Sequence, residues 1–206
     1  MAATFVPAPA VAADWSPRFG GEFRLQAGSG GDDPELAEEE MFEEGLPELR
    51  LGKHFFIGLG FIVSPWHSGR HAAEVEGLGG FSSWSTGTDA TSDRLTSYGV
   101  PLNLLAFYRY ELRASGPDVP IYLRAGGGLS YSVGQGIGSF GNYSGIDYDI
   151  DNAFGAVLEG SFIYAVVGAG LRYTRISSHI AGDDASIDMS SVAAFVSLII
   201  EPGLTL

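Results

Sequence analysis

Cysteine is absent from this 206-residue sequence, which excludes a disulfide framework, a cysteine-ligated zinc site and a catalytic thiol. Long apolar runs are absent too, since no stretch reaches the roughly 18 residues that a membrane-spanning helix needs. Basic residues are few: 11 Lys and Arg stand against 25 Asp and Glu, for a net charge of −14. No basic stripe is available to bind phosphates, so the chain is not expected to bind nucleic acid.

Glycine and aromatic residues are abundant instead, with 30 Gly, 13 Phe and 9 Tyr. This composition is unusual for a soluble helical protein and suits short β-strands. Apolar and polar residues alternate with period two in eight segments, most of which have the roughly ten residues that a tilted strand needs to cross a bilayer. The predicted strands are 18–28, 49–63, 71–82, 97–112, 120–133, 152–162, 163–176 and 189–201.

The connections between these strands alternate in length. In an up-and-down meander, long and short connections that alternate fall at opposite ends of the strands, as in a transmembrane barrel with tight turns below and larger loops outside. We therefore expect an all-β fold, an eight-stranded antiparallel up-and-down transmembrane β-barrel over residues 17–206. The long connections are 29–48, 83–96, 134–151 and 177–188, and the short ones are 64–70, 113–119 and the junction at 162–163.

Two stretches repeat one pattern at an offset of 42 residues: "YLRAGGGLSYS" at 122–132 and "YAVVGAGLRYT" at 164–174. Both are predicted to be rising strands that meet the same environment at the same depth. One face of each is apolar, with Leu129 or Leu171, and we expect it to contact lipid. Aromatic residues on this face sort by depth, as in the interfacial girdles of a membrane barrel. The upper set is Phe81, Tyr131 and Tyr173, and the lower set is Phe61, Tyr108, Tyr110 and Phe162.

The opposite face must fill a lumen that is only just wide enough for side chains. A buried charge is costly unless it is paired, and arginine can bind a carboxylate through two parallel hydrogen bonds. The ionisable residues of this face are nearly balanced, and its glycines are expected to make room for the arginines. We interpret the set as a structural plug, with a narrow pore for small solutes or ions as the alternative. This lumen network comprises Glu22, Arg24, His54, Glu74, Glu76, Arg109, Glu111, Arg124, Glu159 and Arg172.

The four long connections carry most of the negative charge, with 17 of the 25 acidic residues and only Arg94 among the basic ones. Divalent cations or basic partners are the natural counterparts of such a surface. Within the first connection, Asp33 as N-cap, Pro34 at the first helical position and Gly45 as a stop predict a short helix over about 34–44.

Three motifs match a functional pattern only in part. "DYDID" (147–151) spaces its acids like the start of a calcium loop, but the sixth position is Asn152 instead of glycine. "GQGIGSFG" (134–141) has the glycine spacing of a dinucleotide site, but no helix follows it. His179 lies near serine and aspartate residues, which keeps a lipid-modifying enzyme as an alternative, although no spacing requires it. We expect no catalytic activity, no cofactor and no metal.

The chain resembles the small outer-membrane β-barrel families of Gram-negative-type bacteria, the OmpA-like and opacity-like barrels. The resemblance implies an outer-membrane location, contact with the lipid bilayer and lipopolysaccharide, and a structural or surface-interaction role. A soluble lipocalin-like ligand-binding barrel is the competing interpretation, and it would invert the two faces. Residues 1–16 are expected to be a residual signal peptide or a flexible arm. The resemblance is carried by "VPLNLLAFYRYEL" (100–112), "PIYLRAGGGLSYS" (120–132), "AFGAVLEGSFIYAVVGAGLRYT" (153–174) and "VAAFVSLII" (192–200).

Arginine substitutions test which face contacts lipid. Leu129→Arg and Leu171→Arg are each expected to destabilise the membrane-folded protein by about 2–4 kcal/mol near the bilayer midplane, because the new charge would face hydrocarbon. Ser130→Arg, one residue away, would point into the lumen and is expected to behave differently. Refolding titrations in lipid vesicles measure these free energies, and equal costs at positions 129 and 130 would contradict the assignment of faces.

Overall fold

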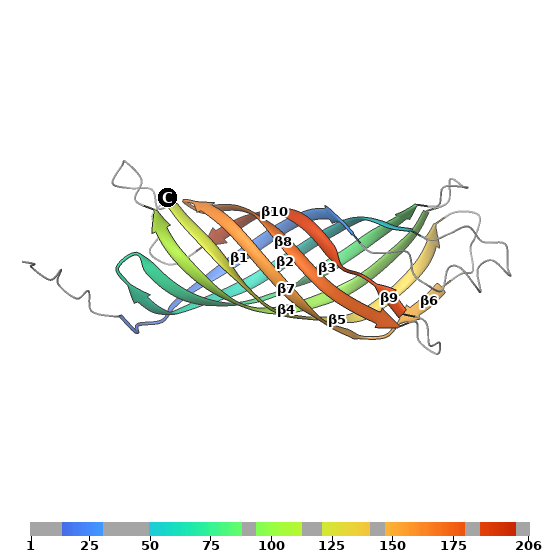
Figure 1. Cartoon of the computed structure of the whole chain (residues 1–206), viewed down its shortest axis with the longest axis horizontal. Coiled ribbons are helices and arrows are strands. Elements are labelled where there is room, and N and C mark those ends of the chain that lie inside the picture. Colours follow the sequence, from blue (N-terminus) through green and yellow to red (C-terminus); the bar gives the residue numbers. More distant parts are fainter. Residues whose placement is uncertain are drawn as a thin grey trace, which may run out of the picture.

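The computed structural model describes residues 14–30, 50–87, 94–112, 121–140, 147–179 and 186–200, and it confirms the predicted eight-stranded barrel. Each wall strand pairs antiparallel with the next, and β10 pairs with both β8 and β1, which closes the sheet (Figure 1). Within these ranges, no helix is long and apolar enough to cross a membrane. The wall strands are β1 (Arg18–Ser29), β2 (Arg50–Ser68), β3 (His71–Gly87), β4 (Arg94–Leu112), β5 (Ile121–Phe140), β7 (Ala153–Tyr164), β8 (Val167–His179) and β10 (Ser191–Ile200).

Two short strands extend the wall at one end. β6 (Asp147–Ile150) pairs with β5, and β9 (Ser186–Asp188) pairs with β8. Both lie at the right of Figure 1, and we call this the loop end. At the opposite end, which we call the turn end, the described residues include two tight connections, at residues 69–70 between β2 and β3 and at 165–166 between β7 and β8.

Several strand boundaries differ from the predictions because β-bulges interrupt the alternation. β5 was expected to end at 133 but continues to Phe140, beyond a register shift at Gly134, whose φ is 60°. β2 likewise continues past 63 to Ser68, beyond a register shift that includes Pro65. A bulge inserts one residue into one strand, so the inward and outward positions exchange while the hydrogen-bonded ladder continues. The turn expected at 162–163 lies at 165–166, where Ala165 has a φ of 54°.

The start of the described chain lies against the turn end. Asp14 and His67 exchange two backbone hydrogen bonds of 2.8 and 2.9 Å. A backbone hydrogen bond from Ser16 to the Asp14 carboxylate also lowers the pKa of Asp14. Residues 1–13 of the expected arm, and the helix expected at 34–44, lie outside the described residues.

The outward face of the barrel is an apolar belt. Its leucines at positions 59, 104, 129, 158 and 171 are 61–71% exposed, whereas the residues between them along each strand point inward. In β10 this alternation holds at every residue. Every outward-facing residue is uncharged in the strand segments 19–27, 55–63, 73–83, 98–110, 123–131, 154–162, 167–173 and 192–200.

Inward-facing glycines lie opposite inward-facing aromatic rings. Gly126 pairs with Phe107 across β4 and β5, and Gly170 pairs with Phe195 across β8 and β10. A methyl group built on Gly126 or Gly170 would lie 2.7 Å from the opposite ring. On Gly126 it would also lie 2.0 Å from the Ala106 carbonyl oxygen. These two glycines of the repeated stretches therefore make room directly for phenylalanine rings.

The close approach at Gly126 predicts the effect of adding a single methyl group. Gly126→Ala is expected to destabilise the barrel by about 1–3 kcal/mol, because the methyl group overlaps the β4 backbone. Gly77→Ala is the control, since a methyl group there meets no atom within 4 Å. This substitution is expected to leave the free energy of unfolding unchanged, or to raise it by about 0.4–1 kcal/mol, because alanine reduces the conformational entropy of the unfolded chain. Urea unfolding in detergent measures the free energy of unfolding of both variants. Equal values would show that the close approach of β4 to Gly126 does not exclude a methyl group.

Candidate functional site: the barrel interior

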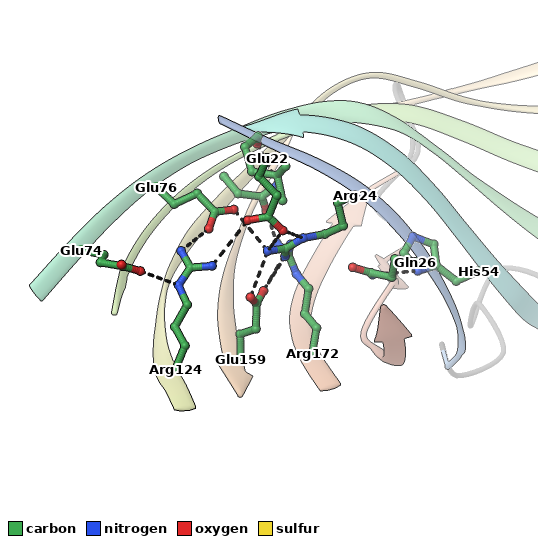
Figure 2. Close-up of polar contacts among 11 residues, drawn as sticks. Glu22, Arg24, Gln26, His54, Glu74, Glu76, Arg124, Glu159 and Arg172 are labelled. Atoms are coloured by element: carbon green, nitrogen blue, oxygen red, sulfur yellow. Dashed lines mark hydrogen bonds and ion pairs between the residues drawn. The ribbon is translucent and has the colours of Figure 1, made fainter. Parts of the chain in front are cut away.

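Nine of the ten ionisable residues expected in the lumen lie buried inside the barrel, each at most 8% exposed. Glu111 is half-buried near the turn end, and His54 lies apart from the others, toward the loop end (Figure 2). The remaining eight residues form one connected cluster of four carboxylates and four guanidinium groups, which we call the ionic layer. Its members are Glu22, Glu74, Glu76, Glu159, Arg24, Arg109, Arg124 and Arg172.

Arg24 is the first centre of the ionic layer and is completely buried. Its Nη1 and Nη2 donate to the two carboxylate oxygens of Glu159 at 2.6 and 3.1 Å. Its Nε donates to Glu22 Oε1 at 2.7 Å, and its Nη2 also lies 3.3 Å from Glu76 Oε1. The partners lie on β1, β3 and β7, so one side chain connects distant parts of the wall through charge-assisted hydrogen bonds.

Arg124 is the second centre. Its Nη2 donates to Glu76, its Nε lies 2.9 Å from Glu74 Oε2, and its Nη1 lies 3.5 Å from Glu22 Oε2. Glu74 also forms an ion pair with Arg109, whose Nη1 lies 2.7 Å from Glu74 Oε1. Glu22 and Glu76 therefore each bind both centres, and the four carboxylates neutralise the four guanidinium groups within the layer.

Aromatic rings cover the faces of these guanidinium groups. The Arg24 Cζ atom lies 4.2 Å from the centre of the Phe195 ring, and the Arg124 Cζ atom lies 3.6 Å from the centre of the Phe107 ring. These are the rings that Gly170 and Gly126 accommodate. The expectation that the glycines make room for arginines is thus refined: each of these two glycines admits a ring, and the ring supports the arginine by a cation–π contact.

Different side chains fill the lumen on the two sides of the ionic layer. At the turn end, Ile62, Ile163 and Ile199 pack together with Tyr122 against them, and the three isoleucines are at most 4% exposed. At the loop end the lumen contains a cavity of about 40 Å³. By the same measure, 10–15 Å³ holds one water molecule, so this cavity has room for a small polar molecule.

The cavity wall combines polar and apolar side chains that the sequence did not single out. Gln26 Nε2 lies 3.5 Å from His54 Nδ1, and the rings of His54 and Trp84 lie 4.2 Å apart. Asn103 and Arg172 also line the cavity, on the side of the ionic layer. Of these residues, only His54 and Arg172 were expected in the lumen network. The sequence indicated Gln26, Trp84 and Asn103 only through their inward-facing positions in the alternating pattern, because none of them carries a charge.

The partial motifs of the sequence do not form a site. The residues of "GQGIGSFG" up to Phe140 continue strand β5. The "DYDI" residues form strand β6, and Ser178 Oγ donates to the Asp151 backbone carbonyl at 2.6 Å. Among the described residues, no group of three or more His, Asp or Glu side chains lies close enough to hold a metal ion.

Comparison with known proteins gives likeness only at the level of solved structures. No family model and no curated protein matches the sequence. The chain is similar to Neisserial surface protein A (NspA), with 15% identity and a TM-score of 0.36 over 91% of this chain and 98% of that one. It is also similar to the COG4313 outer membrane channel from Pseudomonas putida F1, with 13% identity and a TM-score of 0.29 over 96% and 100%. Likeness at this level establishes no shared function.

Loss of one carboxylate from the ionic layer is expected to leave buried cations without full compensation. Glu76→Gln keeps the shape of the side chain but removes the charge that Arg24 and Arg124 share. We expect it to lower the free energy of unfolding by about 3–5 kcal/mol. Glu111→Gln, at a half-buried position outside the layer, is expected to cost less than about 0.5 kcal/mol. Urea titration in lipid vesicles measures both, and a similar small cost for the two would contradict a structural ionic layer.

Proposed function

We propose that this protein is an integral β-barrel of a bacterial outer membrane, with a closed lumen and a structural or surface-interaction role. The observation that carries the proposal is the uncharged apolar belt around a closed sheet. Apolar patches on soluble monomers are typically limited to a few hundred Å². A continuous belt of exposed leucine, valine and phenylalanine needs hydrocarbon around it, and a closed barrel satisfies its backbone hydrogen bonds without water.

Aromatic residues support the same orientation in a bilayer. Phe61, Tyr108 and Phe162 are 44–55% exposed toward the turn end. Phe81 and Tyr173 are 43–47% exposed toward the loop end. Two such girdles are typical of the interfaces of a membrane barrel. The tight turns then lie on the periplasmic side and the loop end lies outside, where lipopolysaccharide, divalent cations or basic molecules are the expected partners.

The soluble lipocalin-like alternative requires the reverse distribution of side chains. A barrel of that class encloses an apolar cavity and exposes its charges to water. Here Arg24 is 0% exposed and Arg124 is 2% exposed, whereas Leu129 is 62% exposed. The side chains favour lipid outside, and an expected absence of enzymatic activity stays part of the proposal.

We favour a closed lumen over a pore because two different layers of buried side chains lie along the axis. The ionic layer joins side chains from β1, β3, β4, β5, β7 and β8, and the isoleucine cluster lies between it and the turn end. An ion would have to separate paired charges and then cross an apolar constriction, and both steps are costly.

Electrical recording distinguishes the closed barrel from the pore. The wild-type protein, inserted in a planar bilayer, is expected to give no single-channel steps above the baseline. Protection of the barrel from protease in vesicles of the same lipid would show that insertion has occurred. Regular conductance steps from the inserted wild-type protein would contradict the closed lumen and support the pore for small solutes or ions. Failure to fold in either lipid or detergent, with folding in plain buffer, would contradict the membrane location itself.

A further inference from the structure

Arg172 is the member of the ionic layer that borders the cavity. It is 4% exposed, and its Nη1 lies 3.9 Å from Glu159 Oε2. Glu159 uses both of its oxygens on Arg24, at 2.6 and 3.1 Å. The charge of Arg172 is therefore compensated at longer range than the charges of Arg24 and Arg124, which have partners within 3 Å.

The guanidinium group of Arg172 is fixed in place but not saturated. One Nη2 hydrogen is donated to Asn103 Oδ1, and Asn103 in turn donates to the Leu78 backbone carbonyl at 3.1 Å. Among the described residues, the buried Arg172 Nε–H has no hydrogen-bond partner. A buried donor without a partner is unfavourable, and one on a charged group especially so. Arg172 is also one of the residues that line the cavity.

The rest of the wall suits a small organic anion. Among the described residues that line the cavity, Arg172 is the one with a formal charge, and none is an aspartate or a glutamate. Gln26 Oε1 is a second buried atom of the lining without a partner among the described residues, and it is an acceptor. Trp84 and Phe56 supply an apolar surface beside these polar groups. A ligand that combines a carboxylate with a neighbouring hydroxyl group offers an acceptor to the arginine and a donor to the glutamine.

We propose that the cavity is a binding site for a small hydroxycarboxylate, with Arg172 binding the carboxylate and Gln26 accepting a hydrogen bond from the hydroxyl group. The isoleucine cluster and the ionic layer lie on the turn-end side of the cavity. The ligand therefore enters from the loop end. In this proposal the lumen is filled by side chains toward the turn end and binds a ligand toward the loop end.

Lactate is a suitable probe, and propionate is its matched analogue without the hydroxyl group. The full chain, folded in detergent micelles, is titrated with each sodium salt and with sodium chloride at equal ionic strength. NMR signals of the Arg172 Nε–H and the Trp84 indole N–H report on the cavity. Lactate is expected to shift both signals saturably, and propionate to bind more weakly. Shifts that match those of chloride would overturn the site, and equal binding of lactate and propionate would overturn the role of Gln26.

Two substitutions on β8 separate the site from general electrostatics. Arg172→Gln is expected to raise the apparent Kd for lactate roughly tenfold or more, read from the Trp84 signal. Arg175→Gln removes a charge from the exposed outward face of the same strand and is expected to leave the Kd unchanged. If Arg172→Gln does not fold, Arg172→Lys keeps the charge and removes the Nε donor, so it must also weaken binding. An unchanged Kd in either Arg172 variant would overturn the proposal.

Discussion

The pairing of Arg24 with carboxylates from three strands is the interaction on which the structure depends most. The side chain is completely buried, and a guanidinium group in such a place is tolerated only when its charge and its donors are satisfied. Glu22, Glu76 and Glu159 satisfy them, although Glu159 is 135 residues away in sequence. Shifting any of these strands by one residue would turn its charge outward into the apolar belt. The ionic layer therefore specifies the register of the barrel and fills its centre at the same time.

The two faces of each strand are adapted to two different surroundings, and this adaptation explains the glycines. Outside, bulky aliphatic and aromatic residues cover the wall without any charge. Inside, the lumen must accommodate long arginines together with the rings of Phe107 and Phe195 that support them. Gly126 and Gly170 make this possible because the ring occupies the space that a side chain of the neighbouring strand would take. Each packing unit consists of a glycine, a phenylalanine ring on the neighbouring strand and an arginine over that ring. The two units do not follow the repeat, because at the offset of 42 residues Gly126 corresponds to Gly168, and Arg24 lies on β1.

Alternation with period two was sufficient to predict the eight strands and the direction of their side chains, because a wall between two unlike surroundings imposes it at nearly every residue. It failed at the strand ends for a specific reason. The bulges at Gly134 and near Pro65 exchange the inward and outward positions, so the pattern stops where the ladder does not. The alternation also identified the charged residues that face the lumen. It could not show which of them form ion pairs, because the depth of each residue along the barrel axis depends on strand tilt and register. The cavity was missed because Gln26, Trp84 and Asn103 are ordinary inward residues until their neighbours are known.

The lumen is asymmetric along its axis, and Arg172 lies at the boundary that matters. Apolar side chains pack at the turn end, paired charges occupy the middle, and polar side chains line a cavity toward the loop end. Because Glu159 is bound more closely by Arg24, Arg172 shares its carboxylate only at 3.9 Å. The side chain of Arg172 is therefore a member of the ionic layer and also a part of the cavity wall. The same guanidinium group that completes the ionic layer is also part of the cavity wall, so the proposed closed lumen and the proposed binding site depend on one arrangement of charges.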